Sequence, residues 1–220
     1  MQIFTNVSIL YQVKRSIKMK SQNRFEKARN IFKRNGGVLR MSEALRAGIH
    51  RRMLYSMLEA GLIEQLSRGL YRLADLPPLS NPDLVSVSLK VPSGVICLIS
   101  ALAYHEITTQ VPHEVYVALD RGTEAPRLDY PPLRIFWFSG QSFTHGIETH
   151  KIDGVPVRIY SPEKTIADCF KYRNKIGLDT AIEALKFYRE KKRFKSNDLM
   201  QFARVCRVEK VIRPYLEALL

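Results

Sequence analysis

Glycines that recur between residues 36 and 69 constrain the fold of this chain more than any other feature. They are Gly36, Gly37, Gly48, Gly61 and Gly69. Glycine is unfavourable inside a helix and supplies the positive φ that often ends one, so each glycine predicts a break. The intervening stretches predict three short helices, over residues 24–35, 42–47 and 50–60, with Ser42 as the N-cap of the second. Their order and spacing predict a compact bundle with a helix-turn-helix between the second and third helices.

The third of these helices is predicted to have one apolar face and one polar face. Met53, Leu54, Met57 and Leu58 fall on one side of the helical wheel, with His50 near its edge; Arg51, Arg52, Tyr55, Ser56 and Glu59 fall on the other. A helix that reads DNA needs outward-facing guanidinium and hydroxyl groups for bases and phosphates. The same pattern also fits an ordinary solvated amphipathic helix, so the context of this helix has to decide.

A predicted β-hairpin follows the third helix directly. The strand-like runs 62–66 and 70–73 are joined by Ser67-Arg68-Gly69, and glycine permits the positive φ that such a turn requires. A hairpin in this position is a wing. Arg68 at its tip and Arg72 on its second strand are expected to reach a phosphate or the minor groove. Residues 22–76 therefore predict a winged helix-turn-helix domain that binds nucleic acid.

Positive charge is concentrated in the same part of the chain. The net charge is +14; residues 1–80 hold 15 Lys and Arg against 5 Asp and Glu, and residues 81–220 hold 20 against 16. Such a distribution suits phosphate binding, although a basic surface without a nucleic-acid partner would also produce it.

Two further features bear on where the protein works. Three widely spaced cysteines without a C-x-x-C pair indicate reduced thiols and a cytoplasmic protein. No run approaches the ~20 apolar residues of a membrane-spanning helix. The basic run 14–20 follows the apolar start of the chain, the reverse of a secretory signal. Residues 1–21 are interpreted as a leader, possibly disordered, unless translation begins at Met19.

The proline-rich segment 77–82 predicts a linker, and residues 83–220 predict a second domain of mixed α+β class. Its expected helices are 83–91 and 100–107, and its expected strands are 115–119 and 133–138. A hairpin of strands 147–152 and 155–160 turns at Asp153-Gly154. Ser161, Pro162 and Glu163 begin a helix to about residue 172, and helices 178–190, 196–206 and 208–220 complete a terminal bundle.

Motifs of the common enzyme classes are missing from the sequence. There is no H-E-x-x-H, no phosphate-binding glycine-rich loop, no G-x-S-x-G and no dinucleotide fingerprint. His145 and His150 could share a metal, but structural or solvated histidines are the more common case. We therefore expect no catalytic residue, cofactor or metal.

Charged residues of the second domain form a possible functional surface. Lys164 and Asp168 are spaced for an exposed ion pair on one helix, with Arg173 and Lys175 just beyond it. The run from Lys186 to Lys195 interleaves aromatic residues with cations, among them Lys191, Lys192 and Arg193. It could bind RNA or an acidic partner, or could simply be a solvated helix end.

Two stretches resemble the AbiEi-type antitoxins of type IV toxin–antitoxin and phage abortive-infection systems. They are GGVLRMSEALRAGIHRRMLYSMLEAGLIEQLSRGLYRLADLP at 36–77 and IYSPEKTIADCFKYRNKIGLDTAIEALK at 159–186. The resemblance extends over about residues 24–220. In the first stretch the helix-turn-helix, the G-L-I-E segment and the S-R-G-L-Y-R wing occur together, which makes it the more specific of the two.

The resemblance implies a transcriptional autorepressor whose winged helix binds inverted repeats in its own promoter. It also implies a C-terminal domain that counteracts a nucleotidyltransferase-type toxin, with or without a stable complex. The expected DNA-binding residues are Arg40, His50, Arg51, Arg52, Tyr55, Ser56, Arg68 and Arg72. The alternative is an adaptor or RNA-binding protein that uses its winged helix to contact a partner.

Overall fold

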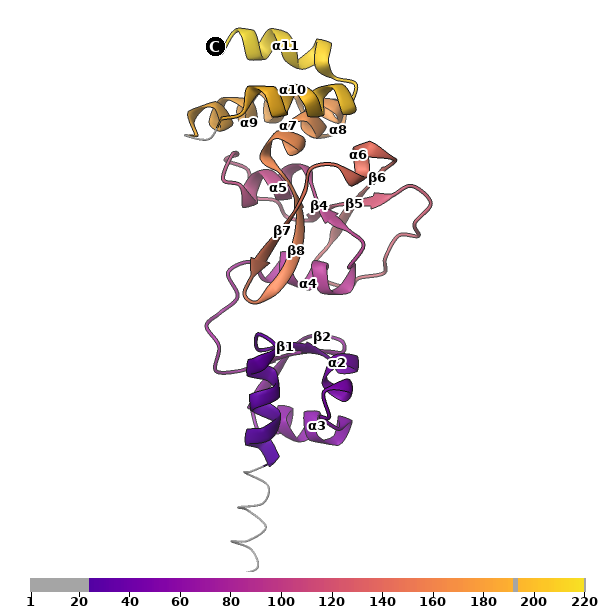
Figure 1. Cartoon of the computed structure of the whole chain (residues 1–220), viewed down its shortest axis with the longest axis vertical. Coiled ribbons are helices and arrows are strands. Elements are labelled where there is room, and N and C mark those ends of the chain that lie inside the picture. The colour runs from indigo at the N-terminus through magenta and orange to yellow at the C-terminus, as the bar shows by residue number, and fades with distance from the viewer. Residues whose placement is uncertain (1–23, 192–193, 220) are drawn as a thin grey trace, which may run out of the picture. The chain divides into compact units, whose positions relative to one another are not determined.

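The computed structural model describes residues 24–191 and 194–219, and the chain divides into two compact units (Figure 1). The first unit extends to Leu79 and the second begins at Ser80, inside the segment 77–82 expected to be a linker. The expected leader, residues 1–21, lies outside the described residues, as do Lys192 and Arg193. Each unit is described by itself.

The first unit is a helical bundle with a small antiparallel sheet. Its elements are a helix over residues 24–34, β1 (Val38–Arg40), α2 (Met41–Arg46), α3 (Arg51–Glu59), β2 (Ile63–Ser67) and β3 (Leu70–Leu73). The strand order is β1-β3-β2. Phe32, Leu54 and Met57 are fully buried in the core between the helices and the sheet. The expected hairpin is confirmed, and Gly69 adopts φ +75° in its turn.

Two details of the first unit differ from the sequence prediction. β1 was not expected; it pairs with β3 through the register Val38↔Arg72 and adds a third strand to the wing. Ser42 is not the N-cap of α2, because that helix begins at Met41 and is capped from Arg40. The Arg40 backbone N–H donates to the Glu43 carboxylate at 2.8 Å. The N-terminus of α2 is therefore capped through Glu43 in its first turn, and not through the Ser42 hydroxyl.

The second unit combines a five-stranded sheet with a helical bundle. Its elements in chain order are α4 (Pro82–Lys90), β4 (Val95–Ile96), α5 (Leu98–Tyr104), β5 (Val115–Asp120), β6 (Leu133–Phe138), α6 (Gln141–Thr144), β7 (Ile147–Ile152), β8 (Val155–Tyr160), α7 (Pro162–Lys171), α8 (Arg173–Ile176), α9 (Leu178–Glu190), α10 (Ser196–Val205) and α11 (Glu209–Glu217). The order of strands is β6-β5-β4-β8-β7. β4 is antiparallel to β5 and parallel to β8, and β5 and β6 are parallel. The expected α+β class is confirmed.

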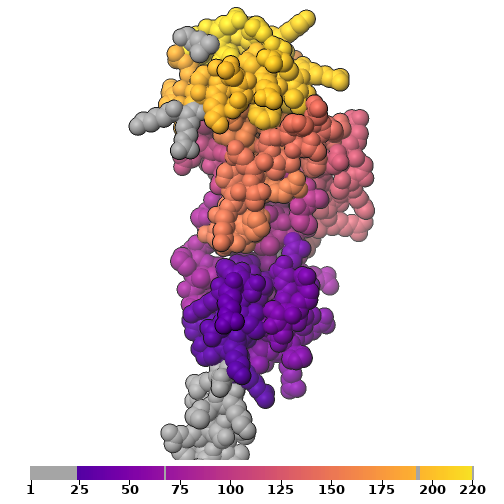
Figure 2. Space-filling view, viewed as in Figure 1, coloured from indigo at the N-terminus to yellow at the C-terminus, as the bar shows by residue number. Residues whose placement is uncertain are grey.

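Helix α7 is the centre of the second unit. It packs against α5, α9, α10 and α11, and every residue from Glu163 to Phe170 is buried. Figure 1 shows α9, α10 and α11 gathered around α7, and Figure 2 shows α10 and α11 forming the outer surface at the C-terminal end. A helix enclosed on all sides is normally apolar, so the charged residues of α7 need internal partners.

Most elements of the second unit follow the prediction closely. The bounds of β6, β7, β8 and α9 agree with the expected ranges, and α5 begins two residues earlier than expected. The short elements β4, α6 and α8 were not expected. β4 has only two residues, too few to show a periodicity, and it exists because it fits between β5 and β8.

Candidate nucleic-acid interface

Helix α3 presents its basic face to solvent because its apolar face holds it on the bundle. Leu54 and Met57 are fully buried, whereas Arg51 and Arg52 are exposed and Tyr55 is 47% exposed. The two guanidinium groups lie in the first turn of the helix, which has no acidic residue. This end carries the positive pole of the helix dipole, so anions are favoured there.

The residues flanking that turn extend the same surface. His50 is the N-cap of α3 and is exposed, and Ser56 is half-buried one turn further along. Arg40 is half-buried at the N-terminus of α2. The predicted separation of apolar and polar faces on the third helix is confirmed; whether these polar residues contact DNA remains a prediction.

A groove beside α3 gathers cations that were not selected from the sequence. It lies between the helix over residues 24–34 and the N-terminal half of α3, with Arg24 and Lys27 on one wall and His50, Arg52 and Ser56 on the other. No role was predicted from the sequence for Arg24 or Lys27, which belong to the first helix of the unit. Their proximity to α3 depends on how two helices pack, which a helical wheel cannot show.

The wing holds one of its two candidate arginines at the surface. Arg68 is exposed at the turn between β2 and β3. The turn is attached to the bundle, because the Met41 backbone N–H donates to the Gly69 carbonyl at 2.8 Å. This hydrogen bond places the wing tip next to the start of α2.

Arg72 does not have the exposed position that was expected of it. Its side chain is 6% exposed, its Nη1 lies 2.6 Å from Glu64, and its Nη2 donates to the Pro77 carbonyl. All four residues of β3 are buried, and Arg72 is enclosed through its contacts with Glu64 on β2 and with the Pro77 carbonyl, which tie the hairpin to the chain that follows it. The expectation that Arg72 reaches a phosphate is therefore wrong, and its role is structural.

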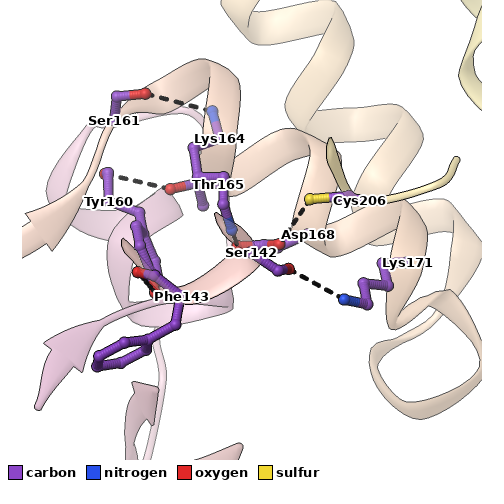
Figure 3. Close-up of polar contacts among 9 residues, drawn as sticks. All are labelled: Ser142, Phe143, Tyr160, Ser161, Lys164, Thr165, Asp168, Lys171 and Cys206. Carbon is purple, nitrogen blue, oxygen red and sulfur yellow. Dashed lines mark hydrogen bonds and ion pairs between the residues drawn. The ribbon is translucent and has the colours of Figure 1, made fainter. Parts of the chain in front are cut away.

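The Lys164–Asp168 pair in the second unit forms as expected, but it is not on the surface. Both side chains are fully buried, and the Lys164 ammonium donates to the Asp168 carboxylate (Figure 3). The same ammonium lies 4.2 Å from the centre of the Tyr160 ring and 4.9 Å from that of Phe138. The spacing correctly indicated the pair, but α9, α10 and α11 cover α7, so the interpretation as a surface pair is wrong.

The second carboxylate oxygen of Asp168 also has a hydrogen-bond donor inside the unit. Cys206 donates its thiol proton to Asp168 Oδ1 at 3.2 Å, and burial raises the pKa of that thiol to about 12. Burial likewise raises the pKa of the Asp168 carboxyl, against the opposing effect of the Lys164 charge. Close by, the buried Tyr188 hydroxyl donates to Glu163. These residues have the environment of a structural network closed to solvent, and they form no open site.

The other candidate residues of the second unit are spread over separate places. Lys175 is exposed on α8, and Arg173 is half-buried, with its Nη1 donating to the Phe170 carbonyl at 2.8 Å. Lys191 lies at the end of α9 and pairs with Glu106 at 3.5 Å. The residues expected to form one functional surface are thus divided between the interior, α8 and the end of α9.

No group of three or more His, Cys, Asp or Glu residues within residues 24–191 and 194–219 is arranged to hold a metal ion. In the same ranges, no helix has both the length and the apolar character needed to cross a membrane.

The geometry of the first unit defines a class of protein. A three-helix bundle, a three-stranded wing sheet and an exposed basic helix together make a winged helix-turn-helix of the DNA-binding type. Residues 26–74 match the family model described as "Transcriptional regulator, AbiEi antitoxin". The resemblance seen in the sequence is confirmed for this segment, and the match supports a DNA-binding antitoxin in general terms.

Among solved structures, this chain matches the crystal structure of RV2827C protein from Mycobacterium tuberculosis with a TM-score of 0.46 and 11% sequence identity, over 82% of this chain and 76% of that chain. Among curated proteins, no sequence matches this chain.

Proposed function

We propose that this protein is the autorepressor and antitoxin of a type IV toxin–antitoxin system of the abortive-infection kind. In this proposal the winged helix binds inverted repeats in the protein's own promoter. The second unit opposes a nucleotidyltransferase-type toxin, with or without a stable complex. The protein acts in the cytoplasm in phage defence, and it has no catalytic activity of its own.

The observation that carries the DNA-binding part is the exposed first turn of α3. Arg51 and Arg52 project from a helix whose opposite face is buried at Leu54 and Met57, so their backbone positions are fixed while their guanidinium groups remain available. Guanidinium forks match guanine edges and phosphates in the major groove. Arg68 on the wing and the cations of the groove beside α3 add further phosphate contacts in the same unit.

A titration of the purified protein against DNA from upstream of its own gene tests this proposal. Fluorescence anisotropy at two salt concentrations should show tighter binding to this DNA than to scrambled DNA of the same length. Affinity should fall steeply with salt. Arg51→Ala/Arg52→Ala should remove the preference for the promoter, whereas Arg72→Ala should alter stability rather than the salt dependence of binding.

The competing function is an adaptor whose winged helix contacts a protein or an RNA. The exposed Tyr55 (47%) and Leu45 (40%) are the observations that favour it, because apolar contacts would suit a protein partner. Equal affinity for promoter and scrambled DNA, unchanged by Arg51→Ala/Arg52→Ala, would remove the repressor proposal and leave the adaptor.

A further inference from the structure

A row of cations lies along strand β6 of the second unit, far along the chain from the winged helix. Arg134, Lys175 and Lys171 lie over aromatic rings of this strand, of the neighbouring strand β5 and of the α7–α8 junction. We call these three residues the cation row. Arg134 begins the row at the start of β6, and the row ends near Phe138, where Arg121 donates its backbone N–H to the Phe138 carbonyl at 2.7 Å.

Aromatic rings fix the positions of these cations. The Arg134 guanidinium lies 5.3 Å from the centre of the Tyr116 ring. The Lys175 ammonium lies 5.8 Å from that of Phe136, and the Lys171 ammonium lies 5.7 Å from that of Phe138. Tyr172 contacts the same two ammonium groups at 5.8 and 5.9 Å. A ring face attracts a cation without neutralising it, so each charge stays in place and can still meet an anion.

The cation row differs in this respect from four other basic residues of the second unit. Lys191, Lys195, Arg204 and Arg213 each pair with a carboxylate. Within the part of the chain that the structure describes, neither Lys171 nor Lys175 has an ion-pair partner; Lys171 donates only to the Ser142 hydroxyl, at 3.1 Å. Arg134 is the exception, since it lies 3.2 Å from Glu114. The row therefore carries at least two charges, those of Lys171 and Lys175, that have no ion-pair partner among the described residues.

The length and line of the row indicate the shape of the ligand. From Arg134 to Phe138 is four residues of strand, or about 13 Å at about 3.3 Å per residue. One strand of a nucleic-acid duplex carries a charge about every 3.4 Å of its axis, so the row spans a few consecutive phosphates. A single small anion would engage only one member, whereas an extended polyanion can engage all of them.

We propose that the cation row binds the phosphodiester backbone of a nucleic acid, as a second contact independent of the winged helix. The row does not by itself distinguish DNA from RNA, because its cations would contact phosphates and not base edges. The proposal does not depend on promoter recognition by α3, and it is tested with ligands of scrambled sequence.

The experiment uses the full chain carrying Arg51→Ala/Arg52→Ala, so that α3 contributes little to binding. Affinity for a scrambled DNA duplex and for a single-stranded RNA of equal length is measured by anisotropy over a range of salt concentrations. Adding Lys171→Gln/Lys175→Gln removes the two unpaired charges of the row. The matched control is Lys151→Gln/Lys210→Gln, which removes two exposed lysines of the same unit that lie outside the row.

The row variant should lower the slope of log affinity against log salt by about 1.8 if duplex DNA is the ligand, or by about 1.4 if single-stranded RNA is. The nucleic acid whose slope falls by its own expected amount is the ligand. The control should leave the slope nearly unchanged. Lys171→Arg/Lys175→Arg should bind like the parent chain, which separates loss of charge from damage to the fold. Equal slopes for the row variant and the control would overturn the proposal. So would a row variant that keeps its affinity for nucleic acid but loses binding to a polyglutamate peptide.

Discussion

Helices α3 and α7 both carry several charged side chains, but those of α3 are exposed to solvent and most of those of α7 are buried. α3 exposes Arg51 and Arg52, while α7 encloses Lys164 and Asp168 so completely that neither side chain reaches solvent. Both helices have an amphipathic pattern. The difference lies in what surrounds them, because α3 has one covered face, whereas α7 is covered by helices and by the rings of Phe138 and Tyr160 from the sheet.

The comparison shows why one cluster is a candidate interface and the other is a framework. Exposed cations exchange water for phosphate at small penalty, and their own unit gains little stability from them. Buried charges must be paired, and the pair then couples the elements that supply it. In the second unit the Lys164–Asp168 pair links α7 to Cys206 beyond α10, which would make it sensitive to any change in one partner.

The largest effect is expected from breaking the buried pair. Asp168→Ala leaves the Lys164 ammonium without its carboxylate inside the unit, and the free energy of unfolding should fall by about 3–5 kcal/mol. Urea unfolding followed by circular dichroism measures this. The double variant Lys164→Met/Asp168→Leu should recover most of the loss, because it removes both charges. A single variant as stable as the parent would mean that the pair is open to water.

The second-largest loss of stability is expected from substituting the glycine that lies next to Lys164. Gly146 adopts φ +75°, and a Cβ there would lie 2.7 Å from Lys164 Cβ. Gly61, in the first unit, adopts φ +66° with nothing within 4 Å of such a Cβ. Gly61→Ala should therefore lower the free energy of unfolding only by the strain of placing alanine in a left-handed backbone conformation, about 1–2 kcal/mol. Gly146→Ala should lose about 1–3 kcal/mol more through overpacking, measured by the same unfolding assay. Equal losses would show that the α7 environment can relax.

Substitution on the exposed helix should affect binding rather than stability. Arg51→Ala should weaken affinity for promoter DNA by about 1–3 kcal/mol, as expected for one lost guanidinium contact. The free energy of unfolding should stay within about 0.5 kcal/mol of the parent value, since the side chain is exposed. Glu59→Gln, on the same helix but removing a negative charge, is the control and should not weaken binding. If Arg51→Ala lowered the free energy of unfolding but left DNA affinity unchanged, Arg51 would have a structural role and α3 would not differ from α7 in the way described.

The smallest effect should be a dependence of stability on pH that originates in the second unit. His105 is half-buried, with its Nε2 2.7 Å from the Tyr160 carbonyl, and burial lowers the pKa of the imidazole. A lowered pKa in the folded state means that stability is fully present above the unfolded value of about 6.5 and declines as pH falls through the folded value.

Urea unfolding between pH 7.5 and 5.5 measures this decline. His105→Gln should flatten it, because glutamine takes up no proton. His50→Gln changes the exposed histidine at the start of α3 and serves as the comparison variant, which should keep the parental profile. Identical profiles for the parent and His105→Gln would remove His105 as the source.

The elements that were predicted well have turn or capping residues within or next to their own sequence. The Asp153-Gly154 turn between two alternating runs predicted β7 and β8 with their observed bounds, and Ser161 followed by Pro162 predicted the start of α7. In the structure the Ser161 hydroxyl accepts the Lys164 backbone N–H, as a capping residue should. β1 and β4 were missed, because a strand of two or three residues forms only when its partners are already in place.

The candidate sites divide in the same way. The exposed face of α3 followed from its helical periodicity, whereas the inward position of Arg72 and the burial of Lys164 and Asp168 did not. The cation row was only partly visible, since Lys175 was singled out from the sequence but Arg134 and Lys171 were not. Arg134 and Lys171 lie far apart in the chain, and only the packing of α7 and α8 on β6 brings them into line.

The sequence by itself determined the winged helix, the α+β class of the second unit, and which face of α3 is polar, because each depends on residues near one another in the chain. Only the tertiary structure decided which charges reach solvent. Burial is a property of everything that packs around a side chain, so Arg72 and Arg68, four residues apart on one hairpin, end in opposite environments.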